Sequence, residues 1–148
     1  MPFFRRRTIL AGAAVLVLGA VVLAWVIVPG REHAARVELG RRLYADHCAS
    51  CHGTALQGEP NWQYPKPDGR MPAPPHDASG HTWHHSDEEL FRITKFGMAA
   101  VVPGYESVMP AFAGVLSDRE IEAVLAYIKS TWPDRERTYQ QERSRGRS

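Results

Sequence analysis

A long charge-free stretch near the N-terminus limits how much of this chain can form one folded unit. Residues Thr8 to Val28 carry no charged side chain, and the last 15 residues, 134–148, contain no aliphatic residue. Removing both ends from the 148 residues leaves about 105 for a folded domain. This length excludes a TIM barrel or a full dinucleotide-binding fold. A domain this small has a thin core, which gains stability from any bound apolar group.

The charge-free stretch is long enough to cross a membrane. As a helix, residues 9–28 would rise about 30 Å, the thickness of a hydrocarbon core. Arginines at positions 5–7 precede it, and a positive flank stays on the cytoplasmic side. We therefore expect a basic cytoplasmic N-terminus (residues 1–8), a single-pass anchor in a bacterial inner membrane (residues 9–28), and the rest of the chain in the periplasm.

A cleaved signal peptide is the alternative interpretation of residues 9–28. Its apolar region usually runs only about 7 to 15 residues before a small-residue cleavage site. Cleavage after Ala24, with Val22 two residues before it, would leave an apolar stub at residues 25–28. We therefore favour an uncleaved anchor.

Charge and cysteine usage exclude two further classes of protein. Residues 29–133 carry 10 basic and 13 acidic side chains, a balance of −3, with no basic, aromatic-lined face typical of nucleic-acid binding. The only cysteines, Cys48 and Cys51, are too few and too close for the disulfide framework of a secreted miniprotein.

Hydrophobic periodicity predicts an all-α domain over residues 31–133. A first helix is expected over residues 31–47, after Pro29 and Gly30 end the membrane span. Residues 53–80 read as a long loop, because six prolines between Pro60 and Pro75 remove backbone donors. A loop of that length is unusual in a compact domain unless it wraps something.

Two more helices are expected to begin at capping boxes. Ser86 and Glu89 form one such pattern, and Gly97 marks the stop. Ser117 and Glu120 form the other. A hydrophobic staple and an apolar stripe accompany this last helix, formed by Leu116, Ile121, Val124, Leu125 and Ile128, and it ends near Trp132 and Pro133. No alternating strand pattern appears, and the polar tail, residues 134–148, is expected to be disordered.

The motif that carries chemistry is Cys48-Ala49-Ser50-Cys51-His52, which is the CxxCH attachment pattern of a c-type haem. Two thiols three residues apart can reach the two vinyl groups of a porphyrin, and the adjacent imidazole can meet the iron. A thioredoxin-like site would need a preceding strand, and a plain disulfide would leave His52 unused. A zinc site would need a second ligand pair, which His81, His84 and His85 could supply. The haem interpretation is favoured.

Haem iron needs a sixth ligand or leaves that position open, and the candidates are Met71, Met98, Met109 and several histidines. Met109 precedes the last predicted helix by eight residues and lies on an irregular segment, so it is favoured as the distal ligand. Met98 is interpreted as filling the core and Met71 as lying on the exposed proline loop. A thioether ligand favours ferrous iron and raises the reduction potential.

Together these motifs resemble a class I cytochrome c, a small all-α fold wrapped around one covalent haem c. The resemblance runs from Val37 to Trp132 and rests on several motifs in order: Gly40 and Tyr44 before CASCH, Gly53 after it, VMPAF at residues 108–112, and LSDREIEAVLAYIKSTW at residues 116–132. It implies that Cys48 and Cys51 bind haem, that His52 and Met109 are the axial ligands, and that Gly40 lets the first helix cross the last one near Tyr127.

The resemblance also implies that a proline carbonyl orients the proximal imidazole, a role that Pro74 or Pro75 would fill. The chain departs from the family in the long, proline-rich segment 57–77. Four histidines follow within ten residues, at positions 76, 81, 84 and 85. They either bind a second metal such as copper or zinc, or hydrogen-bond the haem propionates while Trp83 packs at the haem edge.

These observations predict a membrane-tethered periplasmic electron carrier, not an enzyme, whose partners are membrane respiratory complexes or soluble redox carriers. Two alternatives stay open. One is an enzyme with an open distal site, or a haem subunit of a larger oxidoreductase. The other is copper handling by the histidine-rich loop.

Overall fold

The computed structural model describes residues 27–146, and the chain divides into two compact units, Met1–Ala35 and Arg36–Ser148. The predicted cytoplasmic N-terminus and nearly all of the predicted anchor lie outside the described residues. Within residues 27–146, no helix is both long enough and apolar enough to cross a membrane. Residues 27–47 are helical and include Pro29 and Gly30, so the prediction that these two residues end a helix is wrong. A single proline removes only one backbone donor, and the remaining hydrogen bonds of a helix can persist.

In the second unit, the helical residues from 36 to 47 cross α4 (Asp118–Ser130) at Gly40. A Cβ added to Gly40 would lie 1.8 Å from the carbonyl oxygen of Ala123 and 3.0 Å from the Cβ of Tyr127. Only a residue without a side chain permits this approach, as the resemblance implied. Tyr44, one turn later, is buried and lies against Tyr127, with 5.4 Å between the ring centroids.

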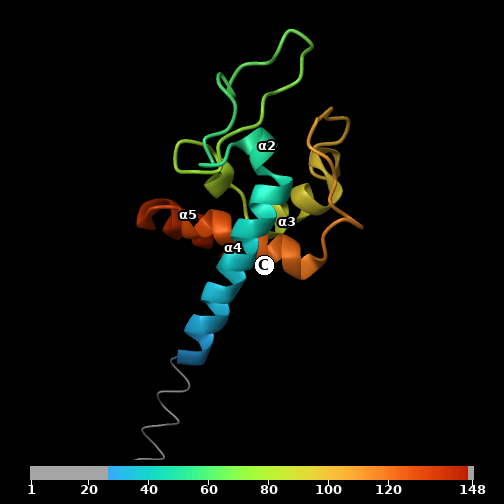
Figure 1. Ribbon diagram of the computed structural model, residues 1–148. Coiled ribbons are helices and arrows are strands. Elements are labelled where there is room, and N and C mark those ends of the chain that lie inside the picture. Colours follow the sequence, from blue (N-terminus) through green and yellow to red (C-terminus); the bar gives the residue numbers. More distant parts are fainter. Residues whose placement is uncertain (1–26, 147–148) are drawn as a thin grey trace, which may run out of the picture. The chain divides into compact units, whose positions relative to one another are not determined.

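A short helix and a long loop follow the first helix. α2 (Ala49–His52) is a single turn that ends at Gly53, whose φ of 82° suits glycine. No helix is assigned from residue 53 to residue 81, which confirms the predicted loop (Figure 1). Its far end is tied to the core, since His76 N–H donates to the carbonyl of Leu56 and Trp132 Nε1 donates to the carbonyl of His76.

The two predicted capping boxes are both present. α3 (Asp87–Phe96) begins after Ser86, whose Oγ accepts from the N–H of Glu89, and it ends at Gly97. α4 begins after Ser117, whose Oγ accepts from the N–H of Glu120. Two short 3-10 helices flank α3, η1 (Thr82–His84) and η2 (Met98–Ala100). The described residues contain no strand, which agrees with the predicted all-α domain.

Two apolar clusters make the core, and α4 contributes to both. Tyr44, Leu56, Leu90, Val124, Ile128 and Trp132 belong to the first cluster, and Phe112, Leu116 and Ile121 form the second. The predicted stripe of α4 therefore faces the core, and the predicted staple pair, Leu116 and Ile121, shares one cluster.

The polar tail is helical, so the prediction of disorder is wrong. α5 (Asp134–Arg145) packs against η1. Gln140 is fully buried, and its Nε2 donates to Asp87 Oδ1, the carbonyl of His85 and Ser144 Oγ at 2.6, 3.3 and 3.0 Å. Tyr139 adds an edge contact to the Trp83 ring. α5 has no apolar stripe, and specific hydrogen bonds and ring contacts hold it in place instead.

Candidate haem site

The CASCH motif lies at the turn between the first helix and the long loop. Cys48 is the N-cap of α2, its N–H donates to the carbonyl of Tyr44, and His52 is the last residue of α2. One helical turn places both thiols and the imidazole on the wall of the same cavity. Cys48 is half-buried and Cys51 is exposed. Burial raises the pKa of the Cys48 thiol to about 11.

His52 is buried and has one ring nitrogen committed to the backbone. Its Nδ1 lies 2.8 Å from the carbonyl oxygen of Pro74. Because a carbonyl can only accept, Nδ1 carries the proton and Nε2 keeps its lone pair. Burial lowers the pKa of His52, although the Pro74 hydrogen bond opposes this effect. The imidazole is therefore held neutral, the form that binds a metal. Of the two prolines that the sequence left open, Pro74 makes this contact.

Glycines allow the Pro74–Pro75 backbone to approach the site. A Cβ on Gly58, whose φ is +67°, would lie 2.5 Å from the nitrogen of Pro75 and 2.7 Å from the carbonyl carbon of Pro74. A Cβ on Gly80 would lie 2.1 Å from the carbonyl oxygen of Pro75. The loop can pack this tightly beside His52 only because both positions lack a side chain.

A mostly apolar cavity of about 220 Å³ lies beside His52. Its wall includes Cys48, Cys51, Met71, Pro74, Leu90, Ile93, Met98, Met109, Phe112, Val124 and Ile128. Met109 belongs to the irregular segment between η2 and α4, where its N–H donates to Ser107 Oγ. Its side chain is half-buried and packs against the cluster of Phe112, Leu116 and Ile121. The fold thus brings the predicted distal ligand to the same cavity as the predicted proximal one.

A family model described as cytochrome c oxidase, cbb3-type, subunit III matches residues 35–128. The chain belongs to this family. No curated protein and no solved structure matches the chain significantly. This cytochrome is therefore a mono-haem class I cytochrome c that binds haem c covalently, and a haem-based electron-transfer role follows. Residues 35–47 of the first helix, the haem motif and α4 as far as Ile128 lie in the matched range, whereas α5 lies beyond it.

The residues on the cavity wall fit haem c. Two thiols of a CxxCH motif, an imidazole with a free Nε2 and a thioether sulfur supply the attachment and ligand chemistry that this group requires. The wall is otherwise mostly apolar, which suits a porphyrin face. Met71 and Met98 also line the cavity. The sequence placed Met98 in the core and Met71 on an exposed loop, so it did not identify either as a cavity residue.

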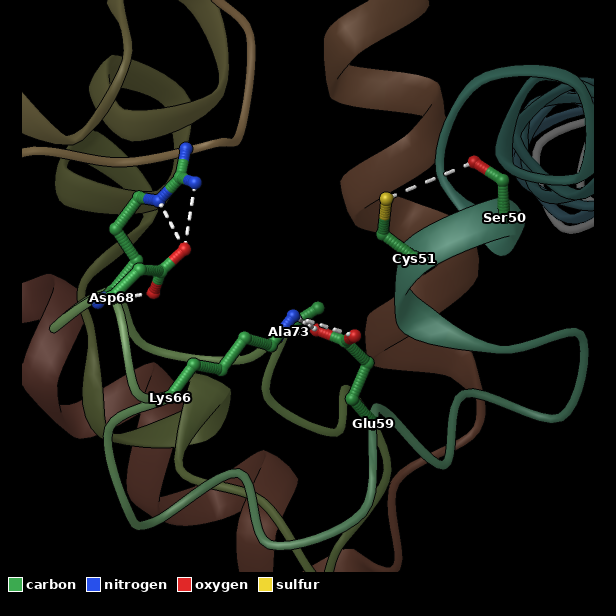
Figure 2. Close-up of polar contacts among 7 residues, drawn as sticks. Ser50, Cys51, Glu59, Lys66, Asp68 and Ala73 are labelled. Carbon is green, nitrogen blue, oxygen red and sulfur yellow. Dashed lines mark hydrogen bonds and ion pairs between the residues drawn. The ribbon is translucent and has the colours of Figure 1, made fainter.

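The anionic side chain of Glu59 links separate segments of the long loop. The Glu59 carboxylate accepts from the N–H of Ala73 at 2.7 Å and from Lys66 Nζ at 2.9 Å, as Figure 2 shows. These bonds hold the pKa of Glu59 below its ordinary value. Within the same loop, Arg70 forms an ion pair with Asp68 at 2.7 Å. Because Ala73 precedes Pro74, the Glu59 bond helps to fix the carbonyl that orients His52.

The four histidines between residues 76 and 85 have different surroundings. His76 stacks on His52, with 4.0 Å between ring centroids, and its Nδ1 lies 2.9 Å from Thr82 Oγ1. His81, His76 and His85 line the cavity, whereas His84 is exposed and contacts the Trp83 and Tyr139 rings. Within residues 27–146, no group of three or more His, Cys, Asp or Glu side chains is arranged to hold a metal ion.

Proposed function

We propose that this cytochrome is a membrane-tethered periplasmic carrier of single electrons, with His52 and Met109 as the axial ligands of a haem bound to Cys48 and Cys51. The observation that carries the proposal is the shared cavity. His52 lies on its wall with Nδ1 committed to Pro74, and the half-buried Met109 side chain lies on the wall of the same cavity. With both axial positions filled, the iron would exchange electrons without exchanging ligands.

The chain's own contribution is to position the group and exclude water. Haem c supplies a one-electron iron couple when bound. The Pro74 carbonyl sets the orientation and basicity of the His52 ring, and the apolar wall keeps the surroundings at low polarity. Cys51 is exposed and Cys48 is half-buried, so a haem bound to both thiols would be more accessible to a redox partner beside Cys51.

The location and partners are part of the same proposal. The charge-free run after Arg5–Arg7 supports an anchor with the haem domain outside the cytoplasm. Membrane respiratory complexes, or soluble carriers that visit them, are the proposed partners, because the matched family is described as an oxidase subunit. The acidic balance of residues 29–133 permits docking to basic surfaces. The mass of mature, membrane-extracted protein tests the anchor: a chain that lacks its first 24 residues would show a cleaved signal peptide.

Optical spectroscopy tests the ligand set. The pyridine spectrum of the reduced protein should show one covalent haem c, and the ferric protein should show the near-red sulfur-to-iron band. Met109→Ala should lose this band and become high-spin, while Met71→Ala and Met98→Ala should keep it. If Met98→Ala or Met71→Ala loses the band instead, the distal assignment is wrong. A wild-type high-spin spectrum that shifts with cyanide would favour an enzyme with an open distal site.

The family description favours a second candidate, a haem subunit of a larger oxidase complex. This candidate keeps the same haem chemistry and differs only in whether the chain stays bound to partners. Extraction in mild detergent followed by size separation distinguishes the two. A free carrier should migrate alone, whereas a subunit should migrate with other respiratory proteins and with oxidase activity.

A further inference from the structure

One polar atom on the cavity wall has no partner within the described residues. His81 Nδ1 is buried and makes no hydrogen bond. The neighbouring His76 differs in this respect, because its Nδ1 lies 2.9 Å from Thr82 Oγ1, and His85 Nδ1 faces the Glu89 carboxylate at the longer distance of 3.9 Å. A buried nitrogen without a partner is destabilising, so its position calls for a group that completes its hydrogen bonding.

The cavity itself indicates the kind of group. No lysine or arginine lines it, and most of its wall is apolar. Haem c carries two carboxylates, and a carboxylate brought into such surroundings needs hydrogen-bond donors. Neutral side chains must then supply them. Thr82 Oγ1 is already engaged with Pro75 and His76, whereas His81 Nδ1 is a buried imidazole nitrogen on this wall without a hydrogen bond among the described residues.

The ring of His81 is held in one plane. Trp62, from the long loop, stacks on it with a centroid distance of 5.3 Å and an interplanar angle of 16°. His85 meets it edge-on at 5.5 Å. A donor with a fixed plane loses little freedom when it forms a hydrogen bond, so the stack pre-organises the site. Burial, with the nearby His85 and His84, lowers the pKa of His81, which keeps the ring neutral before a carboxylate arrives.

We propose that the Nδ1–H of His81 donates a hydrogen bond to one carboxylate of haem c, and that Trp62 fixes the plane of this donor. The proposal rests on the haem attachment at CASCH proposed above. It gives the long proline-rich loop a specific task, because the loop supplies the ring that positions His81. His81 is thus a cofactor-binding residue, and Trp62 is a positioning residue.

The test compares His81→Phe, which keeps an aromatic ring for Trp62 and removes the donor, with His84→Phe at the exposed histidine. In His81→Phe the 13C resonance of one haem carboxylate should shift and the midpoint potential should fall, because a less neutralised carboxylate stabilises ferric iron. His81→Asn should restore part of both changes. His84→Phe should change neither.

Other readouts separate the possible failures. The pyridine spectrum should be the same in His81→Phe and wild type. A wild-type protein without covalent haem would contradict the proposed electron-transfer function, whereas it would say nothing about the contact between His81 and the haem carboxylate. If His81→Phe does not fold, 15N NMR of the wild-type holoprotein decides, since the proposal requires the proton of His81 on Nδ1. A proton on Nε2, or haem carboxylate resonances unchanged in His81→Phe, would overturn the proposal. Trp62→Ala should broaden the His81 resonances.

Discussion

α4 and α5 are successive helices of similar length, and they are held in place by different forces. α4 has 13 residues, a capping box and four buried residues, all apolar. α5 has 12 residues, no side-chain cap at Pro133, and two buried residues, Glu136 and Gln140, both polar. One helix is stabilised by burial of an apolar stripe, whereas the other is held by bonds from a few polar side chains.

The difference shows how a polar helix can be an integral part of a small domain. Gln140, Arg143 and Ser144 bond to the segment from His84 to Asp87. This segment follows the cavity-lining residues His81 and Thr82. α5 therefore braces one wall of the haem cavity from outside the range that the family model matches. The predictions below test each side of this comparison, in order of decreasing effect.

The largest effect is expected where the first helix meets α4. Gly40→Val should abolish the folded haem domain, because even the first side-chain carbon would lie 1.8 Å from the Ala123 oxygen. Circular dichroism and the yield of haem-loaded protein measure the loss. Gly30→Ala is the control, since a Cβ there meets nothing within 4 Å. A folded Gly40→Val protein with a wild-type spectrum would show that the crossing is not needed.

The next largest effect is expected at the apolar stripe of α4. Ile121 is fully buried. Ile121→Ala should lower the free energy of unfolding by about 2–5 kcal/mol, because it leaves a cavity in the second core cluster. Denaturant unfolding of the holoprotein measures this change. Glu122→Ala, at an exposed neighbour, should cost less than about 0.5 kcal/mol. Equal costs would contradict the assigned burial.

Gln140 tests the polar packing of α5. Gln140→Leu should lower the free energy of unfolding by about 1–3 kcal/mol, because Asp87 and the carbonyl of His85 lose a donor. Hydrogen exchange at residues 81–87 should also become faster. Gln141→Leu, the exposed neighbour, should change neither quantity. If both variants behave alike, α5 is not a brace for the cavity wall.

A smaller effect is expected at the cap of α4. Ser117→Ala should cost about 1 kcal/mol, because Ser117 Oγ no longer accepts from the N–H of Glu120. Thermal unfolding of the holoprotein measures it. Thr131→Ala serves as the comparison variant at the other end of α4. It removes a hydroxyl that donates to the carbonyl of Ile128. A loss above 3 kcal/mol would mean that Ser117 has a role beyond capping.

The smallest expected effect is a change with pH in the stability that the same cap of α4 provides. Hydrogen bonds from Ser117 hold the pKa of Glu120 below its ordinary value of 4.5. The ionised carboxylate should thus make its full contribution to the stability of the folded protein above pH 4.5. This contribution should be lost as the pH falls through the lower pKa of the folded state. Glu120→Ala should destabilise the protein at pH 7 more than at pH 3. A difference that does not shrink in acid would contradict this assignment.

Short sequence patterns correctly predicted the elements whose structure depends on interactions between residues close together in the sequence. Ser86 and Ser117 began helices as expected, because a capping box needs only residues three apart. The prediction that the tail is disordered was wrong because α5 is held by Gln140, which bonds to residues more than 50 positions away. Contacts between such distant residues leave no periodic pattern in the sequence. Similarly, His81 could not be distinguished from its neighbours, since the four histidines look alike until burial and partners are known.

By itself, the sequence determined the identity of the attachment motif and the helices that begin at the two capping boxes. These depend on spacing along the chain, which short-range sterics and hydrogen bonding translate into structure directly. Tertiary structure alone decided that Pro74 contacts His52, that three methionines share one cavity, and that a polar tail braces its wall. Each of these depends on atoms brought together from distant positions, where burial sets the strength of every contact.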